Sequence, residues 1–187
     1  MGLFEKLLGK KDKEKAPLEE FMRIEEKHGE RNERKSRELY EEGLKLSEKE
    51  EYEEAIKYFD KAISLDKHLK EAWLEKGFAY LHLSNSDNEF ADFALKSFNT
   101  VLELDPKCED ALWGKFRTYM EKDMYIEALE VNDQLLELTP DDKAVITNRK
   151  GLLHLFFSSG ITRAYELKYG SEALKKLKIE YEKYLQE

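Results

Sequence analysis

The side chains that most often carry out chemistry are few in this sequence, and they are scattered. Among its 187 residues there are four histidines and a single cysteine, Cys108. The histidines are His28, His68, His82 and His154. They lack the i, i+4 spacing and the cysteine partners of metal sites, and none is placed to activate Cys108 as a nucleophile. Acidic pairs such as Glu53 with Glu54, and Asp141 with Asp142, fall at expected helix starts, where carboxylates complement the helix dipole. The sequence therefore predicts no catalytic site, no metal site and no cofactor.

The charge balance limits the classes of partner. Lysine and arginine number 32 against 41 aspartates and glutamates, which gives a formal net charge of −9. A net negative surface does not favour contact with a phosphate backbone, so nucleic acid is not expected as a partner. No apolar run approaches the roughly 20 residues that span a bilayer. The lone cysteine cannot form an intrachain disulfide and no secretion signal is recognisable, so we expect a cytoplasmic location.

The sequence repeats with a period of 34 residues. Four pairs of matching positions are 34 apart: Leu39 and Trp73, Gly43 and Gly77, Ala94 and Ala128, and Pro106 and Pro140. Within one unit, the spacing of small and aromatic residues is typical of two short helices packed on each other, with small residues where the backbones approach. In the first unit these residues are Gly43, Tyr52, Ala55, Phe59 and Ala62.

This pattern resembles the tetratricopeptide repeat (TPR), in which W-x2-L-G-x2-Y is followed by A-x3-F and then by P. The second unit carries most of the signature residue types, at Trp73, Gly77, Tyr80, Ala94, Phe98 and Pro106. The resemblance implies an all-α fold, a right-handed superhelix of helical hairpins with about three repeats and a degenerate fourth or capping unit. It also implies that Ala55, Ala94 and Ala128 are buried between helices. We place the repeats at 36–69, 70–108 and 109–142, with the degenerate repeat and cap at 143–187.

Two repeats depart from the pattern. The second is five residues longer between Gly77 and Ala94 than the first is between its matching positions, and the polar stretch 84–88 is the expected place of the insertion. The third has Phe116 where the family has glycine and Asn132 where it has an aromatic residue. In the last unit we expect a first helix over 144–157, a break at 158–160, a possible extra helical turn within 161–169, and a closing helix from 171. That closing helix should be apolar on its inner face, at Leu174, Leu177, Tyr181 and Leu185.

The first 35 residues lie outside the repeats. Residues 1–16 form a basic tail with five lysines, and 17–35 are expected to hold a helix that ends near Gly29, followed by a linker. The apolar face of that helix, at Leu18, Phe21 and Met22, either caps the first repeat or occupies the groove of its own molecule or of a neighbour. Residues 1–11 carry an apolar face above lysines, which either lies on an anionic membrane, docks on a protein, or is solvated.

In TPR proteins the first helix of each repeat lines a concave groove that holds a peptide or a helix of a partner protein. The resemblance implies that this chain is a non-catalytic adaptor that binds an amphipathic helix or an apolar peptide, and the surrounding acids favour a partner with lysine or arginine. Trp113 is the groove residue expected to be most exposed. The expected inner-surface residues are Tyr40, Leu44, Leu74, Phe78, His82, Trp113, Arg117, Thr147 and Asn148.

Some family members clamp the C-terminal carboxylate of heat-shock proteins with basic and amide side chains. The corresponding positions here hold Tyr40, Leu44, Glu75, Asp110 and Gly114. Two of these are acidic and would repel an anion, so a carboxylate clamp is not expected. Two alternatives to an adaptor stay open. One is a self-assembling scaffold, a homo-oligomer that uses the N-terminal helix or the C-terminal edge. The other is a peripheral membrane adaptor held by residues 1–11.

Overall fold

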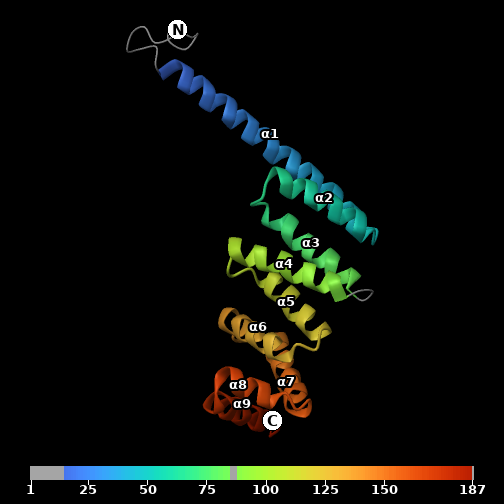
Figure 1. Ribbon diagram of the computed structural model, residues 1–187, viewed down its shortest axis with the longest axis vertical. Coiled ribbons are helices and arrows are strands. Elements are labelled where there is room, and N and C mark those ends of the chain that lie inside the picture. Colours follow the sequence, from blue (N-terminus) through green and yellow to red (C-terminus); the bar gives the residue numbers. More distant parts are fainter. Residues whose placement is uncertain (1–14, 85–87, 187) are drawn as a thin grey trace.

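The computed structural model describes residues 15–84 and 88–186, and every regular element within them is an α-helix. The helices stack in chain order along the long axis of the molecule (Figure 1). Their bounds are α1 Lys15–Glu48, α2 Tyr52–Leu65, α3 Lys70–Leu83, α4 Asn88–Leu104, α5 Glu109–Glu121, α6 Tyr125–Leu138, α7 Lys143–Ser158, α8 Thr162–Tyr169 and α9 Ser171–Tyr184. The predicted all-α solenoid of helical hairpins is confirmed. None of these helices is long and apolar enough to cross a membrane.

Glycines set how closely the helices approach. A Cβ at Gly43 would lie 2.5 Å from the ring of Phe59 on α2, and a Cβ at Gly77 would lie 2.6 Å from the ring of Phe98 on α4. A Cβ at Gly114 would also overlap the Phe98 ring, so this ring sits in notches on both α3 and α5. Both phenylalanines are fully buried. One side chain on α4 thus joins the second helix pair to the third.

The expected small residues between helices are buried. Ala55, Ala94 and Ala128 each expose none of their surface. In the third pair, the large and small residues exchange places, because Phe116 and Asn132 are both buried where the other units have glycine and phenylalanine. The Asn132 amide nitrogen donates a hydrogen bond to the backbone oxygen of Val145, 3.2 Å away on α7. This bond supplies a partner for the amide nitrogen, whereas the buried Oδ1 of the same side chain has none among the described residues.

The insertion in the second pair lengthens α4 at its start. Helix α4 has 17 residues, against 14 in α2 and in α6. The rings of Phe90 and Phe93, in its first turns, lie 6.1 and 5.3 Å from the ring of Tyr80 on α3. Asn88, the last residue of the expected 84–88 loop, is the first residue of α4, and 85–87 lie outside the described residues.

The expected helix end near Gly29 is wrong, because α1 runs without a break from Lys15 to Glu48. Side chains from 20 to 35 are exposed, and Ser36 is fully buried. Phe21 and Met22 expose 59% and 62% of their surface. The first part of α1 therefore projects beyond the repeats (Figure 1) and neither caps the first repeat nor enters the groove of its own molecule. Both of those expectations are wrong. The basic tail up to residue 14 lies outside the described residues.

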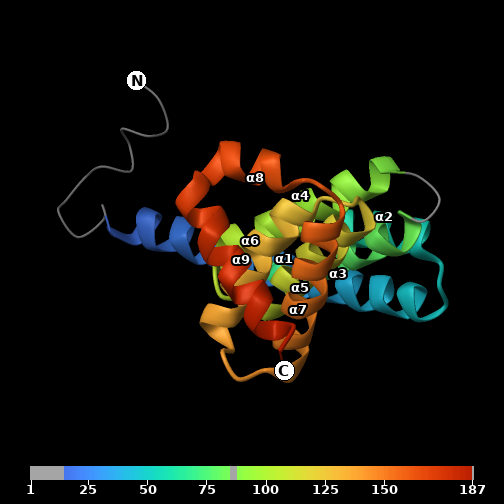
Figure 2. The ribbon, with the colours of Figure 1, turned by 90° about the horizontal axis from the view of Figure 1, so that it is seen from below.

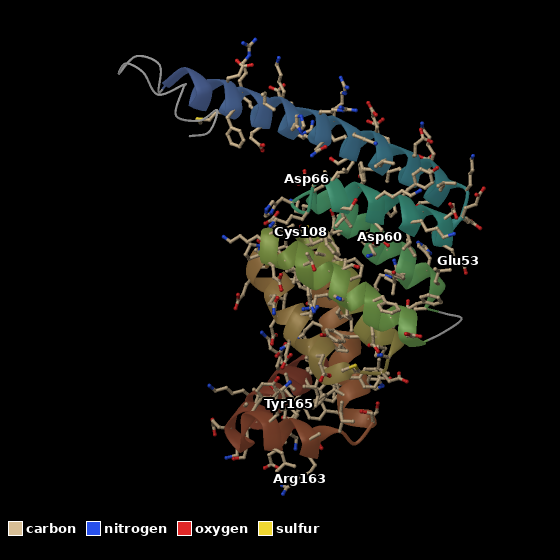
Figure 3. All side chains as sticks on the ribbon, turned by 45° about the horizontal axis from the view of Figure 1, so that its top comes forward. Glu53, Asp60, Asp66, Cys108, Arg163 and Tyr165 are labelled. Atoms are coloured by element: carbon tan, nitrogen blue, oxygen red, sulfur yellow. The ribbon has the colours of Figure 1, made fainter. Side chains whose placement is uncertain are left out.

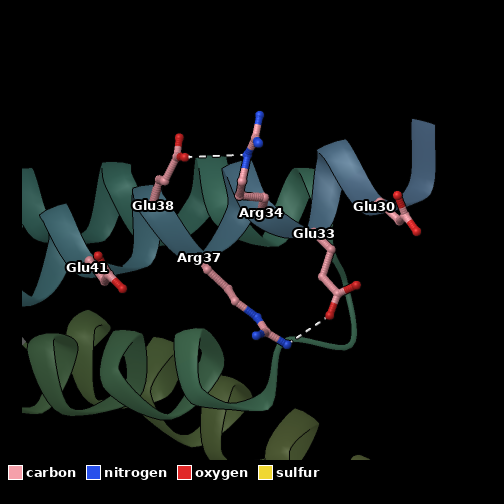
Figure 4. A pocket seen from close by; sticks show the side chains of 6 residues that line it. All are labelled: Glu30, Glu33, Arg34, Arg37, Glu38 and Glu41. Carbon is pink, nitrogen blue, oxygen red and sulfur yellow. Dashed lines mark hydrogen bonds and ion pairs between the residues drawn. The ribbon is translucent and has the colours of Figure 1, made fainter. Parts of the chain in front are cut away.

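Charged pairs where α1 leaves the repeats favour its helical state. Arg37 lies 2.8 Å from Glu33, and Arg34 lies 3.7 Å from Glu38, each pair being four residues apart (Figure 4). Such pairs contribute roughly 0.2–0.5 kcal/mol each to an exposed helix. The glycine within this stretch costs about 1 kcal/mol relative to alanine, which the surrounding helix formers offset.

The last three helices close the solenoid (Figure 2). Helix α7 packs on α9, and α8 occupies the stretch expected to hold an extra turn. Leu177 is buried, and Leu174 and Tyr181 pack against the core as predicted. Leu185 is 65% exposed, so its predicted inward position is wrong. It follows Tyr184, the last residue of α9, and so lies beyond the helix that would have turned it inward.

A buried arginine ties this end together. Arg149 on α7 is 6% exposed. Its guanidinium lies 2.7 Å from the Asp133 carboxylate on α6 and donates two hydrogen bonds, of 3.0 and 3.2 Å, to the Glu180 carboxylate on α9. The Tyr184 hydroxyl donates to the same Glu180 carboxylate at 3.2 Å. One side chain thus connects three helices through charge-assisted bonds.

Replacing the glycine that receives Phe98 should destabilise the protein. We expect Gly114→Ala to lower the free energy of unfolding by about 1–3 kcal/mol, because its methyl group overlaps the Phe98 ring. The matched control is Gly151→Ala on α7, where a Cβ meets nothing within 4 Å. It should raise stability by about 0.5–1 kcal/mol through helix propensity alone. Urea unfolding followed by circular dichroism measures the free energy of unfolding of both variants. Equal changes would contradict the overlap between a methyl group at position 114 and the Phe98 ring.

Removing the buried guanidinium should also destabilise the protein. We expect Arg149→Leu to cost about 1–3 kcal/mol, below the usual cost for a fully buried pair because both carboxylates retain some solvent. The control is Arg163→Leu, whose side chain extends from α8 at the end of the solenoid (Figure 3) and pairs with Glu166 at 2.9 Å. That exposed pair should contribute about 0–1 kcal/mol. Thermal unfolding of the two variants compares them, and a control as damaging as Arg149→Leu would overturn the assignment.

Candidate functional site

A pocket of about 270 Å³ lies where α1, α2 and α3 meet. Its α1 and α3 residues recur at intervals of three and four, so each helix presents one face to it. The lining residues are Leu44, Ser47 and Glu48 from α1, Tyr52 from α2, and Glu75, Phe78, Ala79 and His82 from α3. The pocket therefore belongs to the facing sides of two first helices, together with the start of α2.

The apolar part of the pocket is anchored in the core. Leu44 packs against the buried cluster that contains Phe59, and Phe78 packs against the cluster that contains Phe98. The rings of Phe78 and Phe98 meet edge to face with centroids 5.1 Å apart. Because those phenylalanines are fixed by the glycine notches, the apolar surface of the pocket is held in place before any ligand arrives.

An aromatic stack forms one side of the pocket. The rings of Tyr52 and His82 lie 4.6 Å apart and are tilted by only 4°. Tyr52 opens α2, and His82 lies in the last turn of α3, so the stack joins two adjacent hairpins. This arrangement gives the pocket a flat, polarisable surface.

The polar part of the pocket holds acceptors that the described residues do not satisfy. The Ser47 hydroxyl is buried and has no hydrogen-bond partner among them. Neither Glu48 nor Glu75 forms an ion pair with a described residue. Burial raises the pKa of Glu75, and the negative charge of Asp110 raises it further. The pocket therefore carries negative charge, which Lys45 offsets only in part at Glu48 because its ammonium group is ion-paired to Glu42.

The same acidic character extends along the inner face of α3. Burial raises the pKa of Tyr40, with added effects from the charges of Glu75 and Glu71. The nearby cation on α1, Lys45, is held 2.7 Å from Glu42. A positive group that approaches this face would therefore meet several carboxylates at once.

Three of the nine predicted groove residues line this pocket, namely Leu44, Phe78 and His82. The other predicted residues lie outside it. Tyr40 packs its ring 6.1 Å from that of Phe59, and Leu74 packs against the Phe98 cluster. Arg117 and Thr147 are exposed on α5 and α7, and Asn148 is half-buried on α7.

Trp113 is half-buried rather than freely exposed. Its ring meets Phe116 edge to face at 5.7 Å, and its Nε1–H group donates a hydrogen bond to Glu109 at 3.3 Å. This residue therefore supports the packing of α5 and presents only part of its surface.

Sequence reasoning missed the polar residues of the pocket. Ser47 and Glu48 follow Leu44 by three and four residues, so helical spacing alone would have placed them beside it. Glu75 entered the sequence analysis only as a reason against anion binding. Tyr52 was recognised as part of the repeat, but nothing in the spacing indicated its stack with His82.

The sequence matches one family model. That model, described as tetratricopeptide repeat, covers residues 36–69. A comparison with curated proteins finds no match. The family evidence from sequence is therefore confined to the segment that contains the second part of α1 and all of α2.

Solved structures extend the comparison to most of the chain. The first TPR domain of Spaghetti (RPAP3), solved with the HSP90 peptide SRMEEVD, is 19% identical, with a TM-score of 0.60 over 66% of this chain and 94% of that one. YrrB, described as a TPR protein with an unusual peptide-binding site, is 28% identical over 62% of this chain and 57% of its own, with a TM-score of 0.54. MamA from Desulfovibrio magneticus is 21% identical over 82% and 78%, with a TM-score of 0.55.

These similarities agree with the stacked helical hairpins described above. At such identities the structural matches show the fold. Residues 36–69 match the tetratricopeptide repeat model, and the described part of the chain has the fold of the tetratricopeptide repeat solenoids.

Proposed function

We propose that this chain is a non-catalytic, cytoplasmic protein-interaction module that binds a segment of a partner protein on its concave face. The observation that carries this proposal is the pocket between α1, α2 and α3, in which an apolar base anchored in the core meets unpaired carboxylates. Solved neighbours that bind peptides support it, among them the Spaghetti domain with its HSP90 peptide. The full surface proposed to contact the partner comprises Tyr40, Leu44, Leu74, Phe78, His82, Trp113, Arg117, Thr147 and Asn148.

The chemistry of this face favours a particular kind of segment. Leu44 and Phe78 suit aliphatic groups of a bound segment, which an amphipathic helix or an apolar extended peptide would offer. Glu48 and Glu75 favour lysine or arginine beside it and disfavour a free C-terminal carboxylate. The partner therefore differs from an acidic peptide such as SRMEEVD.

A second candidate function is self-assembly through the projecting part of α1. Phe21, Met22 and Ile24 expose 59%, 62% and 46% of their surface there. A groove of a neighbouring molecule would cover them. The C-terminal edge also exposes apolar side chains, at Leu167, Ile179 and Leu185, but they are spread among lysines and glutamates over α8, α9 and the residue after α9. The membrane alternative rests on the sequence of residues 1–11, which lie outside the described residues.

Peptide selection tests the proposed function. Random peptides displayed on phage and selected on the immobilised full chain should be enriched in apolar and basic residues. Isothermal titration of a selected peptide should show about fivefold weaker binding to Glu48→Lys, because that charge reversal repels the basic segment. The control is Glu53→Lys, the same change at an exposed position on α2 (Figure 3).

Two results would contradict this function. One is the absence of any selected peptide. The other is selected peptides that bind Glu48→Lys and Glu53→Lys equally well, which would place the contact away from the concave face. Light scattering of the full chain tests the second candidate. Self-assembly through α1 predicts an oligomer, and Phe21→Glu should dissociate it into monomers.

A further inference from the structure

The pocket between α1, α2 and α3 contains hydrogen-bond acceptors that lack donors. The Ser47 hydroxyl oxygen is buried without a partner among the described residues, and leaving such a group unpaired costs free energy. The carboxylates of Glu48 and Glu75 line the same pocket, and neither pairs with a described cation. A ligand that fits must therefore bring several donors and a positive charge.

The rest of the pocket is suited to an aliphatic chain and a flat group. Leu44, Phe78 and Ala79 give it an apolar surface, on which the methylene groups of a long side chain can pack. Tyr52 and His82 add their stacked rings. A space of about 270 Å³ is of the size that one large side chain fills.

The arginine side chain combines these features. Its guanidinium group carries five N–H donors in a planar fork, binds carboxylates through paired hydrogen bonds and stacks on aromatic rings. Lysine offers a compact ammonium group that neither stacks nor forks. An apolar side chain would leave the Ser47 hydroxyl and both carboxylates without partners.

We propose that the pocket binds a single arginine side chain of the partner, with the guanidinium group between the Glu48 and Glu75 carboxylates and donating to the hydroxyl of Ser47, whose side chain turns toward the pocket on binding. The arginine methylene groups lie along Leu44 and Phe78. This inference rests on the proposed function, since it names the residue by which a bound segment is anchored. Asp110, whose charge acts on Glu75, extends the attraction toward α5.

The test uses the full chain and one small probe. Nuclear magnetic resonance of the labelled protein is recorded during titration with N-acetyl-arginine amide. Saturable shifts are expected at the backbone amides of Ser47, Glu48, Glu75 and His82, with a dissociation constant in about the millimolar range for so small a ligand. N-acetyl-lysine amide should bind at least threefold more weakly, and N-acetyl-norleucine amide should cause no saturable shift.

Variants separate binding from folding. Glu75→Gln keeps the shape of the side chain and should weaken binding of N-acetyl-arginine amide at least fivefold, while Glu103→Gln, an exposed carboxylate on α4, should leave it unchanged. Ser47→Ala should weaken binding without lowering the melting temperature, because it removes a hydroxyl that the free protein leaves unpaired.

Each outcome decides the proposal. No saturable shift at the pocket, or equal binding of the arginine and norleucine amides, overturns it, and equal binding of the lysine amide overturns the assignment of a guanidinium. Selected peptides that bind the concave face but lack arginine overturn this inference and leave the proposed function standing. If N-acetyl-arginine amide binds the pocket but no peptide is selected, the proposed function is overturned and this inference stands.

Discussion

The approach of the helices depends on phenylalanine rings that fill glycine notches. Phe98 matters most, because its ring lies against Gly77 on α3 and Gly114 on α5 and so fixes two first helices relative to one another. Phe59, on α2, lies against one glycine, Gly43 on α1, and so fixes these two helices relative to one another. Since protein interiors are close-packed, a ring with backbone on two sides leaves little freedom for the helices to slide. The facing sides of α1 and α3, and hence the pocket, inherit that rigidity.

The contacts that hold neighbouring helices together become more polar toward the C-terminal end of the solenoid. In the third pair the phenylalanine moves to the first helix and an amide takes its place on the second, with Asn132 bonded to the backbone of α7. Beyond it, Arg149 connects α6, α7 and α9 through two carboxylates. Where the repeat pattern degenerates, directional polar bonds are thus added to ring packing, such as that of Phe156 on Tyr165. They specify one arrangement of helices that apolar contacts alone would hold less uniquely.

The repeat period predicted the helical hairpins because each glycine, alanine and phenylalanine at its fixed interval serves one contact. Outside the repeats, the prediction at Gly29 was wrong, because a glycine there was interpreted as a helix end. A glycine ends a helix only when no better continuation exists, and here charged helix formers continue on both sides. The pocket was predictable only in part, at three of its eight lining residues. Leu44, Phe78 and His82 followed from the family geometry, whereas the unpaired Ser47 hydroxyl depends on which atoms surround it, and no spacing records that.

Because α1 is a continuous helix, it fixes the position of Lys15 relative to the pocket. The 21 residues from Lys15 to the one before Ser36 rise about 31 Å, at about 1.5 Å per residue. Each residue also turns the helix by about 100°, so the length of this stretch sets the direction in which Lys15 points about the helix axis as well as its distance from the repeats. Losing one residue would point Lys15 to another side of the molecule. Losing seven residues would shorten the projecting part of α1 by about 10 Å and would nearly restore the direction of Lys15.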